Sequence, residues 1–293
     1  MSEVIHFDDR QRGVYSARIG DLLVRTVIEI EALSKVLFES VGGVKPVDRY
    51  LYFDTDCLAL LEQKWKIGSK TIFVSSPFFY FEDAKLKALK PLQKASKYGD
   101  KSSKWKQAYQ AVKHDRVNNL HQGNVENLLN ALGALFILNI YYRDAVVDNV
   151  KDGKASNVDW GLGSEVFTVK ISHETQGVRL DKVYVPKADY DECIYLVKYT
   201  DETAQPVIDL LRRLNDEALQ STSDAIADAL NERVKSGVLD VQRDLSEIAS
   251  FVKELYDKMG PSSLVEVTRK NSKQVSTAIS GLRLEAVLNK QQF

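Results

Sequence analysis

Apolar side chains recur every three or four positions between Val14 and Ser40. This spacing places them on one side of a helix, with charged residues such as Arg25 and Lys35 largely off that side. The predicted stripe comprises Ile19, Leu22, Leu23, Val27, Ile30, Leu33 and Leu37. Gly42-Gly43 predicts the end of this helix, because glycine commonly terminates helices.

The next stretch mixes helical and strand patterns. Residues 49–63 predict a second, shorter helix. Residues 70–74 and 77–81 are rich in β-branched and aromatic side chains, which is typical of strands, and they predict a small hairpin inserted between helices. Residues 82–93 predict a return to helix.

A long helical tract is predicted over residues 103–147. It should break near 117–119 or 121–124, where asparagine is a good N-cap and glycine breaks helices. The longest apolar run, Leu128 to Tyr142, is interrupted by two asparagines and is too short to cross a bilayer comfortably. We therefore expect a buried helix and no membrane partner.

The second half of the chain has a different pattern. Residues 150–163 are polar and contain glycine, so they form a candidate linker. Residues 165–171, 178–185 and 193–199 predict three short strands of an antiparallel meander. Helices should follow to the C-terminus.

Two sets of apolar residues in this C-terminal region follow the spacing of four, three, four. They predict the seam of a packed helical hairpin or short coiled coil, with intramolecular packing favoured by the short length. The sets are Val207, Leu211, Leu214, Ala218 and Val241, Leu245, Ile248, Val252, Leu255. Gly237 and Gly260-Pro261 should interrupt or end the two helices of this pair. The predicted class is mainly α with small β elements (α+β), with domains at 1–150 and 151–293.

Composition narrows the setting of the protein. The chain has two cysteines, Cys57 and Cys193, which form no CxxC pair. This excludes a cysteine zinc cluster, argues against a disulfide framework and favours a reducing compartment. The charged N-terminus lacks the apolar core of a signal peptide. We therefore expect a cytoplasmic protein with no metal and no cofactor.

Positive charge is concentrated in one segment, although the formal net charge of the chain is only -1. Between Ala84 and Arg116 the only acids are Asp100 and Asp115. The cations are Lys85, Lys87, Lys90, Lys94, Lys97, Lys101, Lys104, Lys106, Lys113 and Arg116. Such a one-sided run favours polyanionic ligands, and the alternative is a solvated helical face.

The same segment leads into the residues best suited to chemistry. Of four histidines, His114 and His121 lie close together, whereas His6 and His173 lie elsewhere. Histidine exchanges a proton near neutral pH, and arginine binds phosphate bidentately while staying charged. Together with Arg116 they supply what metal-independent RNA cleavage needs: proton transfer at the ribose 2′-hydroxyl and at the leaving 5′-oxygen, and a cation for the transition state.

Spacing constrains this idea. Arg116 and His121 are five residues apart, which separates them by about 140° on a straight helix. They converge only if the helix bends or begins between them, and Asn118-Asn119 could cap such a start. Alternatively, a symmetric dimer could bring two copies together. The competing interpretation is that these side chains only cap or bridge helices.

A family resemblance rests on these residues. The stretch from Trp105 to Arg116, the following Val-Asn-Asn-Leu-His121, and the long apolar helix after it resemble the HEPN (higher eukaryotes and prokaryotes nucleotide-binding) superfamily. Its signature is an arginine, four to six residues and a histidine near the start of such a helix. The earlier helix with Glu29 and Glu31 resembles that fold's acidic helix. The likeness covers residues 14–146.

The resemblance implies a helical bundle that often dimerises, and metal-independent ribonucleases of toxin-antitoxin, abortive-infection and antiviral systems. The motif transfers to Arg116 and His121, with Glu29 or Glu31 as an acidic helper. Many active members have a polar residue directly after the arginine, where this chain has Val117.

The leading hypothesis is therefore a HEPN-type endoribonuclease or RNA-binding effector that acts as a homodimer, with RNA as substrate and a protein inhibitor or activator as a further partner. The predicted catalytic residues are Arg116, His121 and Glu31, and the predicted substrate-binding residues are Lys113, His114, Asn118, Lys106 and Lys104. The alternatives are a non-catalytic protein-interaction module and a nucleotide-binding protein without cleavage.

One further motif is set aside. Gly68-Ser-Lys-Thr resembles part of a phosphate-binding loop, but it lacks the upstream glycine, and a strand rather than a helix is predicted after it.

Overall fold

The computed structural model is mainly helical with small sheets, which confirms the predicted α+β class. It describes residues 6–148, 160–173, 187–238 and 245–292. The chain divides into two compact units. Unit 1 comprises residues 1–174, 184–198 and 285–293, and unit 2 comprises residues 175–183 and 199–284.

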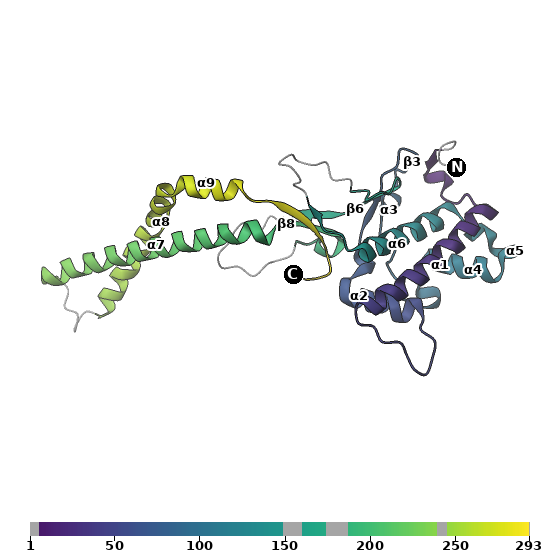
Figure 1. Ribbon diagram of the computed structural model, residues 1–293, viewed down its shortest axis with the longest axis horizontal. Coiled ribbons are helices and arrows are strands. Elements are labelled where there is room, and N and C mark those ends of the chain that lie inside the picture. The colour runs from purple at the N-terminus through teal and green to yellow at the C-terminus, as the bar shows by residue number, and fades with distance from the viewer. Residues whose placement is uncertain (1–5, 149–159, 174–186, 239–244, 293) are drawn as a thin grey trace. The chain divides into compact units, whose positions relative to one another are not determined.

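Unit 1 is built on three helices that pack against one another, α1 (Ala17–Ser40), α4 (Lys104–His114) and α6 (Val125–Arg143) (Figure 1). The predicted stripe of α1 supplies much of this core, since Leu23 is fully buried. Leu22 is an exception with 51% of its surface exposed. It lies one position, about 100°, from Leu23 on the helix and therefore faces outward.

The segment between α1 and α4 is less helical than its pattern predicts. Its elements are η2, a π-helix (Phe53–Leu58), α2 (Ala59–Trp65), η3 (Ile67–Ser69), β2 (Ile72–Val74), β3 (Phe79–Tyr80), α3 (Ala84–Lys87), β4 (Ala88–Leu89) and η4 (Gly99–Lys101). The expected helix over 49–63 thus begins only at Phe53. The expected helix over 82–93 ends at Lys87, where the chain enters a strand.

The predicted hairpin is wrong, because β2 and β3 lie in different sheets. β2 pairs antiparallel with β4 and with β6 (Phe167–Val169). β3 pairs in parallel with β1 (Phe7–Asp8), which precedes η1 (Asp9–Gln11). Ile72 is fully buried between Leu89 and Val169, and this long-range burial outweighs the local turn.

The predicted meander is also wrong. β6 belongs to the sheet of β2, whereas β7 (Ile171–His173) pairs in parallel with β8 (Tyr195–Tyr199). The expected middle strand over 178–185 lies outside the described residues. The sheet of β8 has the order β5-β9-β8-β7, with β5 at Val147–Asp148 and β9 at Leu284–Leu288. The pattern did not predict β9.

The sequence pattern predicts a division near residue 150, but the two units divide elsewhere. The strand β9 explains the difference. β9 pairs with β5, and Asn289, which follows β9, forms hydrogen bonds with the segment before β8. The Asn289 amide donates to the carbonyls of Tyr190 (2.6 Å) and Cys193 (3.2 Å). Residues 184–198 and the C-terminus therefore belong to unit 1. Most of the expected linker, residues 149–159, lies outside the described residues.

Unit 2 contains the helices α7 (Asp201–Lys235), α8 (Leu245–Lys270) and α9 (Ser272–Ser280). α7 and α8 pack together, which confirms the predicted helical pair, but the residues of its seam differ from the predicted set. Leu210 is buried in place of Leu211, Leu245 is 68% exposed, and Val241 lies outside the described residues. The core of the two helices includes Leu214, Ala218 and Val267. Gly237 follows α7 with a φ of +73°, a conformation that favours glycine, but α8 continues through Pro261.

The helix α6 is long and apolar enough to cross a membrane by these criteria alone. In unit 1, however, it packs against α1 and α4, and half of its most apolar stretch is buried. A helix that is apolar on all sides is typical of a protein core. This packing identifies α6 as a core helix of unit 1.

Candidate functional site

The predicted break in the long helical tract lies between α4 and α6, and we call residues Asp115–Asn124 the connection. Its first part is α5 (Arg116–Asn119), where the Asp115 carboxylate accepts a hydrogen bond from the Asn118 backbone (3.3 Å). Its second part is η5 (Leu120–Gln122). Asn124 then caps α6 by accepting from the Asn127 backbone (3.0 Å). Of the two predicted break points, 117–119 and 121–124, the second supplies the cap of the long helix, Asn124.

A close backbone contact fixes the connection on α1. A Cβ placed on Gly123 would lie 2.8 Å from the Cα of Gly20, which is closer than real side chains approach. A Cβ on Gly20 would in turn lie 3.3 Å from the side chain of Leu120. Two glycines therefore allow η5 to sit directly on the helix, which sets where the neighbouring side chains emerge.

Arg116 projects from the connection toward α1. Its guanidinium forms an ion pair and hydrogen bond with Asp21, and 46% of the Arg116 side chain remains exposed. Exposed ion pairs contribute only about 0–1 kcal/mol. An incoming phosphate could therefore compete with Asp21 for this guanidinium, because bidentate arginine–phosphate contacts are stronger.

His121 lies on η5 and is exposed. Within the described part of the chain its ring takes part in no hydrogen bond or ion pair, so it is accessible for proton transfer. The intervening Val117 is 93% exposed, which leaves an apolar side chain where many HEPN members have a polar one. The structure thus places both motif side chains at the surface of one short segment.

Glu31, the predicted acidic helper, does not lie beside Arg116. Glu31 lies ten residues beyond Asp21 on α1, a separation of about 15 Å along the helix axis. Its carboxylate instead accepts from the buried Tyr109 hydroxyl (3.4 Å). Tyr109 also accepts from Lys113 (3.1 Å), and this hydrogen bond raises the pKa of Lys113. We correct the role of Glu31 accordingly, and the alternative Glu29 is exposed.

The other predicted substrate-binding residues remain at the surface, with one exception. His114 contacts Gln110 (3.2 Å), Asn118 donates to Asp115 (2.9 Å), and Lys104 is exposed. Lys106 is only 4% exposed and is not a substrate ligand.

Three oxygens hold the Lys106 ammonium inside unit 1. It donates to Asp54 (2.6 Å), to the Ala95 carbonyl (3.1 Å) and to the Lys97 carbonyl. These contacts satisfy all three of its donors, so nothing remains for a ligand. Spacing gave no sign of this, because Asp54 is 52 residues away.

The rest of the lysine run keeps its exposure. Six lysines are exposed and form no ion pair within the described residues: Lys85, Lys87, Lys94, Lys97, Lys101 and Lys104. Lys90 and Lys106 are paired with acids. The positive field expected from the sequence therefore has a physical source, since unpaired exposed cations attract polyanions.

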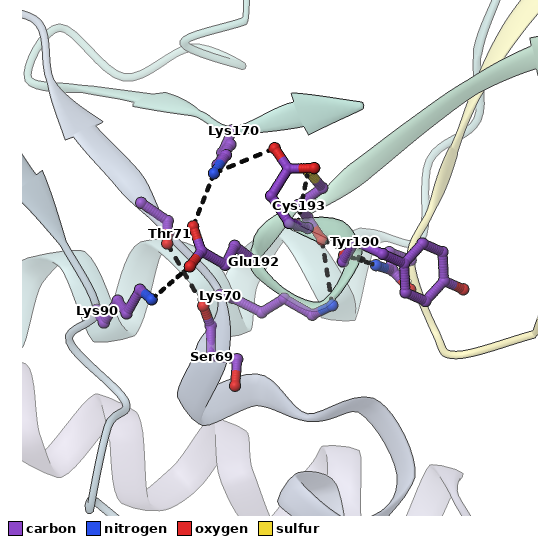
Figure 2. Close-up of polar contacts among 10 residues, drawn as sticks. Ser69, Lys70, Thr71, Lys90, Lys170, Tyr190, Glu192 and Cys193 are labelled. Atoms are coloured by element: carbon purple, nitrogen blue, oxygen red, sulfur yellow. Dashed lines mark hydrogen bonds and ion pairs between the residues drawn. The ribbon is translucent and has the colours of Figure 1, made fainter. Parts of the chain in front are cut away.

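A second polar group was missed by the sequence, and we call it the lysine–acid cluster (Figure 2). It surrounds η6 (Tyr190–Glu192) and comprises Lys66, Lys70, Lys90, Lys170, Asp189, Asp191 and Glu192. Glu192 accepts from Lys90 and Lys170 (both 2.7 Å), and these hydrogen bonds lower its pKa. Lys66 pairs with Asp191 (2.8 Å), which lies 125 residues along the chain, so spacing could not predict the cluster.

Lys70, from the motif that was set aside, is the buried member of this cluster. Its side chain is fully buried and donates to the Cys193 carbonyl (3.1 Å). Burial lowers its pKa to about 7. Lysines with a perturbed pKa often occur at active sites. A substrate cannot reach the ammonium group of Lys70, however, because that group is buried. The strand β2 follows the motif, as expected, and no helix is present there to bind a phosphate.

The described residues offer no other chemical centre of this kind. Cys57 and Cys193 are buried, and burial raises the pKa of each thiol to about 11, so neither is a ready nucleophile. Among the described residues, no group of three or more histidine, cysteine or acidic side chains could hold a metal ion.

The ion pair of Lys66 with Asp191 is about as exposed as that of Arg116 with Asp21, so exposure alone does not separate the two regions. They differ because Lys70 of the cluster is fully buried, whereas the His121 ring of the connection is exposed and has no partner within the described residues. Comparison with protein-family models, with curated proteins and with solved structures gives no match for this chain.

Proposed function

We propose that this protein is a HEPN-type, metal-independent endoribonuclease or RNA-binding effector of a bacterial toxin-antitoxin, abortive-infection or antiviral system. One observation carries the proposal: the Arg116 guanidinium and the His121 imidazole both reach solvent from the connection. The exposed lysines before it would steer RNA toward this surface, with affinity that falls as salt rises. The setting would be cytoplasmic.

The proposed reaction is attack of a ribose 2′-hydroxyl on the adjacent phosphorus. The bond from phosphorus to the 5′-oxygen breaks, leaving a 2′,3′-cyclic phosphate and a 5′-hydroxyl. Arg116 would hold the phosphate and stabilise its negative charge. His121 would act as general base or general acid. His114, or His121 of a second copy in a homodimer, would complete the two proton transfers.

The test uses purified full-length protein, labelled total RNA and EDTA. We expect cleavage in the presence of chelator, and a loss of about 100-fold or more in His121→Ala and Arg116→Ala. His6→Ala is a matched control, because His6 is also exposed but packs beside Phe78 and Tyr80. Arg10→Ala is a second control, because Arg10 also forms an exposed ion pair with an aspartate.

The outcomes separate the two versions of the proposal. Cleavage that both connection variants abolish supports the ribonuclease. RNA binding without cleavage, weakened in Arg116→Ala but not in Arg10→Ala, supports the RNA-binding effector. Neither binding nor cleavage, at concentrations far above those of ordinary RNA-binding proteins, contradicts both versions.

One observation favours a second candidate, a non-catalytic protein-interaction module. Arg116, Lys113 and Asn118 each already have a partner within unit 1. On this interpretation the Arg116 pair with Asp21 holds the connection against α1, and the other two contacts stabilise α4 and the connection locally. Arg116→Ala would then lower the free energy of unfolding without affecting RNA, which thermal unfolding and RNA binding measured on the same sample would reveal.

A further inference from the structure

The helix α6 has two apolar sides, and only one of them faces the bundle. Ala134, Ile137, Leu138 and Tyr141 are buried on the side toward α1 and α4. The opposite side carries Leu132, Leu135, Phe136, Asn139, Ile140 and Arg143. At about 100° per residue these fall on one face, at steps of three and four.

This second face forms one wall of a pocket of about 510 Å³. The opposite wall comes from the segment 162–167 and from Tyr195 of β8. Phe136 stacks on Phe167 with ring centroids 5.6 Å apart. The volume falls within the range of about 300–1,000 Å³ that is typical of sites for small organic ligands.

The turn over the pocket has an unusual backbone. Leu162 has a φ of +51° and Gly163 a φ of +87°. The left-handed conformation costs a residue with a side chain roughly 1 kcal/mol. Strained residues of this kind tend to occur where the surrounding fold holds a ligand site open.

The polar groups of the pocket indicate the charge of its ligand. The Tyr195 hydroxyl donates to the Ala145 carbonyl (3.1 Å), and the Ser164 hydroxyl accepts from the Phe167 backbone (3.0 Å). Arg143 is the one charged residue among those that line the pocket. Within the described residues its guanidinium forms no hydrogen bond or ion pair, and the neighbouring Asp144 pairs with Lys290 instead (2.6 Å).

From this arrangement we infer that unit 1 has a binding site for a small amphipathic anion, an acyl or aryl carboxylate. Its apolar body would lie along α6 between Leu132 and Ile140, where burial from water drives binding. Its carboxylate would accept hydrogen bonds from Arg143, which stands at the last turn of α6. The site is distinct from the connection, which precedes the first turn of the same helix.

The test measures the binding of decanoate and decanol to the full-length protein by titration calorimetry, below the concentration at which decanoate forms micelles. We expect decanoate to bind and decanol to bind more weakly. Arg143→Gln should weaken decanoate binding about tenfold or more and leave decanol unchanged, because it removes only the charged hydrogen bonds. Arg18→Gln is the matched control, since Arg18 is exposed on α1 without an ion pair among the described residues.

A second variant tests the apolar wall. Leu132 lines the pocket and is 36% exposed, so Leu132→Trp narrows the pocket without repacking the core. It should weaken both probes. The inference is overturned if neither probe binds, or if decanoate binds wild type and Arg143→Gln equally. A dimeric wild-type protein that binds neither probe, and that Leu132→Trp converts to a monomer, also overturns the inference. In that case a second copy of the chain would cover this face.

Discussion

The connection and the lysine–acid cluster are built from the same side-chain types, yet water reaches them differently. Arg116 of the connection and its partner Asp21 on α1 are about half exposed, and the ring of His121 has no partner among the described residues. In the cluster Lys66 and Asp191 are exposed to a similar degree, but Lys170 is only 23% exposed and Lys70 is fully buried. Exposure makes a charge available to a ligand, whereas burial makes its partner indispensable.

Two lysines on α4 carry this contrast within one helix turn. Lys104 is exposed, whereas Lys106 is buried on Asp54. Removing one partner of a buried ion pair costs about 3–5 kcal/mol, because the other charge stays buried without compensation. We therefore expect Lys106→Ala to lower the free energy of unfolding by that amount in urea titrations.

The neighbouring Lys104→Ala is the control and should change the free energy of unfolding by less than about 0.5 kcal/mol. Equal effects for the two variants would contradict the contrast drawn between exposed and buried lysines. A large loss in Lys104→Ala alone would show that the burial of this helix face is assigned wrongly.

The next largest effect concerns Lys70 and depends on pH. Its pKa is about 7 in the folded protein and near 10.5 when exposed, because burial penalises the charged form. Below pH 7 both states carry the proton, and the buried charge costs on the order of 5 kcal/mol relative to a neutral side chain. Between these values only the unfolded state binds the proton, so stability rises with pH.

Lys70→Met should remove this dependence. The variant should be more stable than wild type near pH 6, and the advantage should shrink toward pH 9 and beyond. The Cys193 carbonyl keeps a donor, because Asn289 also bonds it. Urea titrations across this pH range measure the effect, with Lys66→Met as the half-exposed control. A constant difference between Lys70→Met and wild type would show that Lys70 is charged or neutral throughout.

The sequence predicts those parts of the molecule that depend on local spacing. The helix over 17–40, the packed helices of unit 2 and the break before His121 follow from apolar periodicity and from asparagine or glycine at helix ends. Strand partners do not follow from spacing. Ile72 pairs with Val169 rather than with the next strand, because long-range burial decides which edge is covered.

The candidate site divides in the same way. The sequence places Arg116 and His121 together because they share one short segment. It cannot show that Asp21 accepts from Arg116, that Glu31 turns to Tyr109, or that Lys106 is buried. Each of these contacts joins residues more than 50 positions apart. The lysine–acid cluster was missed for the same reason.

A smaller effect tests how firmly the connection is fixed. Gly123→Ala would place a methyl group against the backbone of Gly20. Because backbone cannot move aside as a side chain can, we expect a loss of about 1–3 kcal/mol in stability. RNA cleavage should fall as well, since the shift moves His121. Gly13→Ala, with nothing within 4 Å, is the control. Full cleavage in a destabilised Gly123→Ala would show that His121 needs no fixed position.

The smallest effect distinguishes a phosphate-binding arginine from a structural one. Asp21→Asn removes the carboxylate that competes with phosphate for Arg116, and exposed pairs of this kind contribute at most about 1 kcal/mol. RNA affinity should therefore rise about two- to fivefold, while the free energy of unfolding changes little. Asp100→Asn removes one exposed charge from the lysine run without an arginine partner among the described residues, so it reports the effect of net charge alone. A gain in Asp21→Asn beyond that of Asp100→Asn assigns phosphate binding to Arg116. Equal gains in RNA affinity, or a loss of stability without a gain in affinity, would show that Arg116 only fixes the connection to α1.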